Sequence, residues 1–300
     1  MKKLRIVVAL PNDNAYQHEQ ALVAKSTGEQ LGLDLQILKA ADDSITQSQQ
    51  LLEIIQSRAD VPAAFIVEPV TATGLRRVAE AAVSAGIGWV ISNSDVDYVK
   101  DLRKTTKVPV FIVTQGQFEI GRLQGKQFAA LLPQGGNVLY LEGPSMSSVA
   151  LQRREGMESA RSPKIALTTV RSKWSEDSAY LSAVAWLRLA TSRAERFNLV
   201  AGQTHELALG ARKAFQNMED QVQRQKWMDT PFLGIGIAGQ VKPLVHGHIL
   251  DAAVVTSVTT DTALKLVVRA LESQVQPPER TVVEVSSYPE LEKVAGKSAL

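Results

Sequence analysis

Residues 4–16 have the sequence LRIVVALPNDNAY, in which seven mostly aliphatic residues run directly into a polar segment. Such a run predicts a buried strand, and residues 17–31 after it have the composition of a helix. Strands that are apolar along their whole length are typical of parallel sheets, which are covered on both faces. The stretch therefore predicts the first strand-to-helix step of a parallel sheet.

Four side chains with polar groups follow this strand, namely Asn12, Asp13, Asn14 and Tyr16. Open parallel sheets bind ligands beyond the carboxyl ends of their strands. Three short polar groups and a ring at that edge suit a hydroxylated small molecule. The alternative is that the Asn and Asp residues only cap the helix, since both residue types are preferred at that position.

Strand-like and helix-like segments alternate along the rest of the chain. Apolar runs at residues 34–38, 63–67 and 86–91 are separated by segments with helical character, a further run follows at 108–113, and the alternation continues from 118 to 285. This pattern predicts an α/β fold of doubly wound parallel layers. Because the 300 residues exceed what one core usually reaches, we expect two lobes.

The composition excludes several classes of protein. A net charge of +2, without a dense basic block, argues against a nucleic acid partner. The absence of cysteine excludes disulfides, thiolate zinc sites and cysteine nucleophiles. No apolar run reaches the roughly 18 residues that a membrane span needs, so no membrane insertion is expected.

The first residues resemble the beginning of a signal peptide, because Met1, Lys2 and Lys3 precede an apolar run. The run stops at Pro11, and no small-residue cleavage site follows it. Taken alone, the sequence therefore predicts a soluble, unexported chain.

Two motifs that could indicate an enzyme are weak. Residues 234–239 match the dinucleotide pattern G-x-G-x-x-G, but they lie late in the chain and Asp251 precedes its strand instead of ending it. His205 and Glu206 begin a zincin motif in which Leu209 replaces the second His. No catalytic constellation, metal site or cofactor is predicted.

Trp174 follows the predicted strand 165–170 and precedes a helix, which places its ring at the carboxyl edge of the sheet. Together with Tyr16 it could stack on the apolar face of a sugar while polar groups bind the hydroxyls. The alternative is that Trp174 covers the core.

The order of elements resembles that of the type I periplasmic binding proteins, the ribose-binding branch that also supplies the effector cores of lactose-repressor-type regulators. The most specific similarities lie in four segments: residues 67–81, Gly121–Gly125, Arg153–Met157 and Glu206–Ala211. The glycines at 234–239 fall where that family has a Gly-Phe-Asp-Gly loop, which gives them a structural explanation.

This resemblance implies two similar α/β lobes that close over a ligand in the cleft between them. The expected N-terminal lobe comprises residues 1–113 and 257–283, and the C-terminal lobe comprises 114–256 and 284–300. Three crossings of the chain, near residues 113–115, 256–259 and 283–286, would form the hinge.

Individual positions carry over from the family with several departures. Asp13, Tyr16, Asn93, Gln117 and Trp174 match polar or stacking positions. Leu151 and Ser94 stand in place of sugar-binding Arg residues, Thr204 and His205 replace an Asn-Asp pair, and Gly236 replaces an Asp. These departures favour a larger, less polar or modified ligand over an ordinary monosaccharide.

The prediction is a non-enzymatic protein that binds a carbohydrate-like ligand, as the solute-binding component of an ABC-type sugar uptake system with a membrane permease as partner. The alternatives are an intracellular sensor core of a regulator and, more remotely, an NAD-dependent oxidoreductase. The resemblance implies a periplasmic location, with the cytoplasm as the alternative. The predicted ligand-binding residues are Asn12, Asp13, Asn14, Tyr16, Asn93, Gln117, Trp174, His205 and Thr256.

Overall fold

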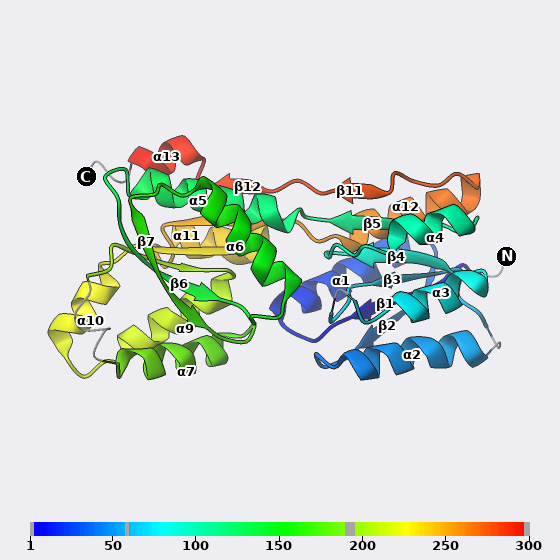
Figure 1. Cartoon of the computed structure of the whole chain (residues 1–300), viewed down its shortest axis with the longest axis horizontal. Helices are drawn as coiled ribbons and strands as arrows, with labels where there is room; N and C mark the ends of the chain where they lie inside the picture. The colour runs from blue at the N-terminus through cyan, green and yellow to red at the C-terminus, as the bar shows by residue number, and fades with distance from the viewer. Residues whose placement is uncertain (1–2, 58–59, 72, 190–195, 297–300) are drawn as a thin grey trace. The chain divides into compact units, whose positions relative to one another are not determined.

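The structure, a computed structural model, describes residues 3–57, 60–71, 73–189 and 196–296 (Figure 1). The chain forms two compact units, and each contains two separate stretches of sequence. Unit 1 comprises Met1–Gly116 and Val258–Val283, and unit 2 comprises Gln117–Ser257 and Glu284–Leu300. Residues 297–300, which were expected at the end of the C-terminal lobe, lie outside the described residues.

Unit 1 is built on a parallel sheet of six strands in the order β11-β5-β4-β3-β1-β2. Its strands are β1 (Arg5–Leu10), β2 (Asp34–Lys39), β3 (Ala64–Val67), β4 (Gly88–Ser92), β5 (Val110–Thr114) and β11 (Arg280–Val282). Its helices are α1 (Ala15–Gln30), α2 (Ser44–Ser57), α3 (Arg76–Ser84), α4 (Val99–Thr105) and α12 (Thr260–Ser273).

Alternate side chains of β1 enter two different cores. Val7 and Ala9 pack with residues of α2, α3 and α4, whereas Ile6, Val8 and Leu10 pack with residues of α1 and α12. Successive side chains of a strand point to opposite faces, so the sheet of unit 1 is covered by helices on both sides. This is the doubly wound arrangement that the alternation of strand-like and helix-like segments predicted.

Unit 2 repeats the design with one difference. Its sheet has the order β12-β10-β9-β8-β6-β7 and is parallel except for β12, which pairs with β10 in the antiparallel direction. The strands are β6 (Gly136–Glu142), β7 (Ile165–Arg171), β8 (Leu199–Gly202), β9 (Phe232–Ile237), β10 (Ala252–Thr256) and β12 (Ser286–Tyr288). The helices are α5 (Gln117–Leu131), α6 (Ser148–Ala160), α7 (Glu176–Leu187), α9 (His205–Gln216), α10 (Gln221–Met228), α11 (Ala238–His246) and α13 (Leu291–Gly296).

The sheet of unit 2 also separates two cores. Leu139 and Leu141 of β6 pack with residues of α7, α9, α10 and α11, while Val138 and Tyr140 pack with residues of α5, α6 and α13. The tryptophans Trp186 and Trp227 lie in the first of these cores, where Trp227 stacks on Phe215 with ring centroids 4.2 Å apart. They are therefore structural residues.

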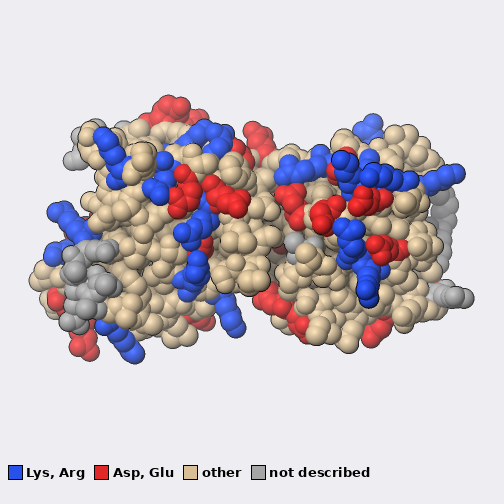
Figure 2. All heavy atoms as spheres, in the orientation of Figure 1, with Lys and Arg blue, Asp and Glu red and all other residues tan. Residues whose placement is uncertain are grey.

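The surface and the helices agree with the composition. Figure 2 shows acidic and basic side chains interspersed over the visible face, without a large field of one sign. Within the described parts of the chain, none of the helices combines the length and the apolar character that crossing a bilayer requires.

Candidate functional site

The loop between β1 and α1 brings the first group of predicted residues to the carboxyl edge of the unit 1 sheet. The Asn14 side chain accepts a hydrogen bond from the Gln17 backbone N–H at 2.9 Å and so caps α1. Asn12 accepts from the Asn14 N–H at 3.0 Å, and its Nδ2 donates to Asp42 Oδ1 at 2.7 Å. The capping alternative thus describes what Asn14 does here, and Asn12 stabilises the loop.

Asp13 lies on the same loop with 62 % of its side chain exposed and forms an ion pair with Lys39, the last residue of β2. The hydrogen bond and the charge of Lys39 hold the pKa of Asp13 below its ordinary value of 3.8. Asp13 is therefore a charged acceptor that solvent can reach.

A buried carboxylate lies beside these residues at the end of β3. Glu68 is 7 % exposed, and its Oε1 accepts hydrogen bonds from Gln17 Nε2 at 2.8 Å and from Asn93 Nδ2 at 3.0 Å. Asn93 follows β4 directly and has a φ of 54°, a left-handed conformation that Asn tolerates better than most residues. The structure thus brings predicted Asn93 together with Glu68, which the sequence analysis did not assign.

Tyr16 is placed by a separate set of polar contacts. Its hydroxyl accepts hydrogen bonds from Gln20 Nε2 at 3.0 Å and from Gln115 Nε2. Gln20 Nε2 also donates to Thr259 Oγ1 at 2.9 Å, and Gln20 Oε1 accepts from the N–H groups of Thr259 and Thr260 at 3.0 and 3.1 Å. Tyr16 is thereby fixed to residues that end unit 1's first stretch and begin its second.

At the carboxyl edge of unit 2, Trp174 follows β7 and is partly buried. Its ring lies so close to Gly143 that a Cβ there would come within 2.3 Å of Trp174 Cη2, and it also packs against the core beside α7. The ring therefore covers the core at least in part, as the alternative prediction had it.

Gln117 and Arg153 form a second buried pair of polar residues. Arg153 is 7 % exposed; its Nε donates to Gln117 Oε1 at 2.9 Å, and its Nη1 donates to the backbone oxygen of Gln203 at 2.5 Å. Gln117 was predicted, whereas Arg153 was noted only as part of a family-like segment. The sequence signal that could have located Arg153 is Gly156, one helical turn further along α6, because α5 packs closely against this glycine.

His205 begins α9, capped by Thr204, and is 7 % exposed. Its Nδ1 lies 3.3 Å from the Ile235 backbone oxygen, and a Cβ on Gly236 would come within 2.7 Å of the same atom. Thr256 ends the adjacent strand β10 and is 4 % exposed. Both predicted residues therefore lie at the ends of the central strands of unit 2.

The position of the glycines corrects the sequence interpretation of residues 234–239. Gly234 and Gly236 lie inside β9 and not in a loop, and each leaves room for His205. A dinucleotide fingerprint needs its glycines in the turn that opens the following helix, where backbone N–H groups reach the phosphates. The NAD-dependent alternative therefore loses the loop on which it depended.

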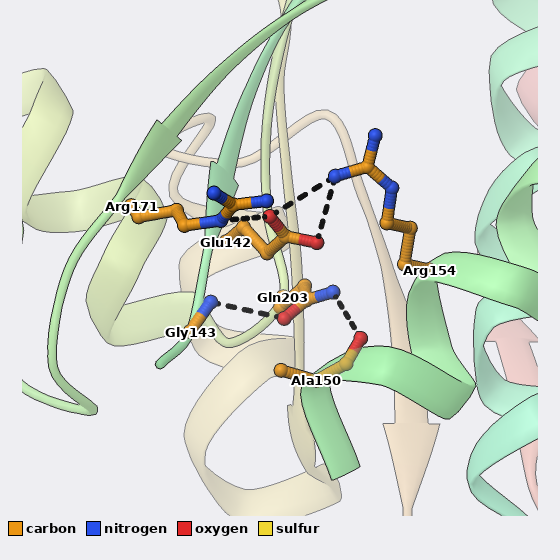
Figure 3. Close-up of polar contacts among 6 residues, drawn as sticks. All are labelled: Glu142, Gly143, Ala150, Arg154, Arg171 and Gln203. Carbon is orange, nitrogen blue, oxygen red and sulfur yellow. Dashed lines mark hydrogen bonds and ion pairs between the residues drawn. The ribbon is translucent and has the colours of Figure 1, made fainter. Parts of the chain in front are cut away.

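Glu142 is a further polar residue that the sequence analysis missed. It ends β6, its side chain is 3 % exposed, and it accepts from Arg171 Nε at 2.9 Å and from Arg154 Nη1 at 3.3 Å (Figure 3). Gln203 lies beneath it, accepting from the Gly143 N–H at 3.0 Å and donating to the Ala150 oxygen at 2.9 Å.

The described residues contain no cluster of three His, Cys, Asp or Glu side chains that could hold a metal ion.

Solved structures with the same fold share almost the whole length of the chain. An ABC transporter solute-binding protein from Bacillus halodurans with bound myo-inositol has 20% identity and a TM-score of 0.81, covering 99% of this chain and 98% of its own. A periplasmic solute-binding protein from Actinobacillus succinogenes with bound D-allose has 19% identity and a TM-score of 0.81, covering 98% and 100%. The fructose-binding periplasmic domain of a hybrid two-component system has 22% identity and a TM-score of 0.79, covering 99% and 93%.

No curated protein matches the sequence significantly. A family model described as the periplasmic binding protein domain, however, matches residues 6–274, which is most of both units. The fold, the order of elements and this match agree with the resemblance noted in the sequence. The chain therefore belongs to the periplasmic binding protein family.

Proposed function

We propose that the chain is a non-enzymatic receptor for a small, polyhydroxylated molecule. The observation that carries the proposal is the buried carboxylate of Glu68, which lies with Asn93 and Gln17 at the carboxyl edge of a parallel sheet. Burying a carboxyl group costs free energy unless hydrogen bonds compensate for it, and the place of Glu68 at the ligand-binding edge of the sheet supports a role in binding. A carboxylate and an amide are the groups that pair with hydroxyls in a dry site.

In unit 2, the proposed contacts are Gln117 with Arg153, the ring of Trp174, His205 and Thr256. In unit 1, they are Asp13, Tyr16 and Asn93 with Glu68. The family resemblance implies that one ligand contacts the carboxyl edges of both sheets. The structure supports this through the polar side chains found at each of these edges, considered separately. Asn12 and Asn14 are weaker candidates because their side chains already stabilise the loop.

The relatives supply the biological setting of the proposal. Structures similar to this chain contain myo-inositol and D-allose and come from ABC transporters, so we infer a role as a solute-binding component with a membrane permease as partner, outside the cytoplasm. A sensor role is the second candidate, because a similar fructose-binding domain belongs to a two-component system. A stable dimer in solution would favour the sensor, and a monomer would favour the transporter.

The test is a thermal-shift screen of the purified protein against neutral sugars, polyols, sugar acids and sugar phosphates, followed by calorimetric titration of each hit. A ligand at a hundredfold excess over its Kd adds about 2.7 kcal/mol to the free energy of unfolding. NAD and NADP serve as negative compounds. If no hydroxylated compound stabilises the protein, the proposal is wrong.

The substitution Glu68→Gln tests the residue that carries the proposal. It keeps the shape of the side chain but removes its charge, and we expect roughly a 10- to 100-fold weaker affinity for the hit, the usual value of a hydrogen bond to a charged group. Glu80→Gln, on the exposed face of α3, is the matched control. Equal affinities of both variants would exclude Glu68 from the site.

A further inference from the structure

The strand ends of unit 2 carry a cluster in which one buried carboxylate is shared by two arginines. Glu142 ends β6, Arg171 ends the neighbouring strand β7, and Arg154 lies on α6. Figure 3 shows the two guanidinium groups approaching Glu142 from opposite sides. Arg171 Nε lies 2.9 Å from Glu142 Oε2, and Arg154 Nη1 lies 3.3 Å from both carboxylate oxygens.

The charges of this cluster do not cancel. One guanidinium would neutralise Glu142, so the second leaves a surplus positive charge at the edge of the sheet. Glu206 of α9 lies 3.3 Å from His205, and the ion pairs of Arg154 and Arg171 are both with Glu142.

Both arginines that flank Glu142 keep donors available to a ligand. The side chains of Arg154 and Arg171 are 37 % and 57 % exposed, whereas that of Glu142 is 3 % exposed. A guanidinium has five N–H donors, and within the described part of the chain Arg154 uses only Nη1 and Arg171 only Nε. Charge-assisted bonds to the fixed carboxylate hold both groups in place, and their exposed fractions leave the remaining N–H groups within reach of a ligand.

The position of the cluster relates it to the predicted site. Leu151, which stands in place of a sugar-binding arginine of the family, precedes Arg154 by one helical turn on α6, so both lie on the same face. Arg171 is three residues before Trp174, and Gln203 lies beside Glu142 (Figure 3). The resemblance places a cation at position 151, and this chain instead carries Arg154 one turn further along the same helix, paired with the same Glu142 carboxylate as Arg171.

We propose that the ligand of this protein carries an anionic group, a carboxylate or a phosphate ester, that Arg154 and Arg171 bind. This inference rests on the proposed function and names the class of ligand as polyhydroxylated acids. The planar fork of a guanidinium matches carboxylate and phosphate oxygens with two parallel hydrogen bonds. Neutral hydroxyls could accept hydrogen bonds from these groups but would not neutralise the surplus charge of the cluster.

The experiment compares acids with their neutral partners: D-galacturonate with D-galactose, D-glucose 6-phosphate with D-glucose, and myo-inositol monophosphate with myo-inositol. Affinities are measured by calorimetric titration at about 20 mM and about 500 mM NaCl. We expect at least one acid to bind about tenfold more tightly than its neutral partner at low salt, and this preference to shrink at high salt. The carboxylate and phosphate pairs show which anion the cluster prefers.

The variant R154Q/R171Q should lose the preference, with about tenfold weaker binding of the acid and little change for the neutral partner. The control R76Q/R122Q removes the same charge from arginines that pair with Asp97 and Glu119 elsewhere and are 42 % and 39 % exposed. It should retain the preference. If R154Q/R171Q does not fold, R154K/R171K keeps the charge and tests the fork geometry instead.

The outcomes separate this inference from the proposed function. If neutral partners bind as tightly as the acids, or if R154Q/R171Q keeps the preference, the anionic ligand is wrong while the receptor function stands. If neither acids nor neutral compounds bind, the receptor function itself is wrong.

Discussion

At the scale of single residues, Gly143 shows how the absence of a side chain positions a neighbouring ring. A Cβ at this position would lie 2.3 to 2.6 Å from three carbons of the Trp174 ring. Gly143 follows Glu142 and donates its N–H to Gln203 Oε1, so its backbone is also fixed from the other side. The ring, and not the backbone, must move if a methyl group is added.

We therefore predict that Gly143→Ala lowers the free energy of unfolding by about 1–3 kcal/mol, the usual cost of forcing extra volume into a packed place. The fluorescence of Trp174 should change with it. Chemical denaturation measures the first effect and emission spectra the second. Gly239→Ala, where a Cβ meets nothing within 4 Å, is the control and should be neutral or stabilising.

The ion pair of Asp13 and Lys39 predicts that the stability of the folded protein depends on pH. Because the folded protein holds the pKa of Asp13 below 3.8, the pair contributes stability above the unfolded pKa, and this contribution is lost as the pH falls through the folded pKa. Lys39→Met should raise the pKa of Asp13 toward 3.8, observed by NMR titration of its carboxyl carbon. Lys25→Met on α1 should leave this pKa unchanged; an equal rise in both variants would contradict the assignment to Lys39.

Residues that act through local sequence were predictable, and those that act across the fold were not. The Asn14 cap and the polar residues after β1 follow from their neighbours in sequence. Glu142 is different, because its partners Arg154 and Arg171 lie 12 and 29 residues away, and a glutamate at a strand end is ordinarily exposed. Only the folded sheet brings them together.

At the scale of elements, α5 and α6 approach each other closely through two glycines. A Cβ on Gly121 would lie 1.9 Å from the Arg153 oxygen, and one on Gly156 would lie 1.9 Å from the Phe118 oxygen. These glycines belong to the segments that carried the family resemblance. The resemblance thus reflects a packing requirement of the helices that place Gln117 and Arg153.

Gly121→Ala should separate α5 from α6 and reduce the free energy of unfolding by about 3 kcal/mol, at the upper end for overpacking because the obstacle is backbone. Urea denaturation measures this loss. Glu155→Ala, an exposed position beside Gly156, should change stability by less than about 0.5 kcal/mol. A stable Gly121→Ala protein would show that the two helices can shift without cost.

Short elements escaped the sequence analysis for physical reasons. Helix α4 has seven residues and β12 has three, which are too few for an apolar period to appear. The glycines of β9 looked like a loop because glycine is rare inside strands. In the structure these glycines leave room for His205, whose Nδ1 lies 3.3 Å from the Ile235 oxygen although the two residues are 30 positions apart in the sequence.

At the scale of the whole molecule, the prediction concerns closure on a ligand. Members of hinge-closing families bind by a rigid-body rotation of domains, and the resemblance implies this for the present chain. We expect the radius of gyration, measured by small-angle X-ray scattering, to decrease when a hit from the ligand screen saturates the protein. NAD, as a compound without a predicted site, should leave it unchanged. An unchanged radius with bound ligand would exclude closure.

The overall α/β architecture was predictable because most of the central strands are apolar runs and the alternation with helices is regular. The antiparallel pairing of β12 with β10 was not, since nothing in three residues indicates strand direction. The class of ligand also needed the structure, because the surplus charge of the Glu142 cluster depends on residues from three elements.

The contacts of Gln20 have a consequence for how the protein is made. Gln20 lies on the first helix, yet its partners Thr259 and Thr260 lie 239 and 240 residues further along the chain. The edge strand β11 of the same unit ends only at Val282. On a ribosome, most of unit 2, which is continuous from Gln117 to Ser257, emerges before unit 1 can be completed. The first stretch of unit 1 must therefore keep the β5 edge of its sheet unpaired until residues 280–282 have been synthesised.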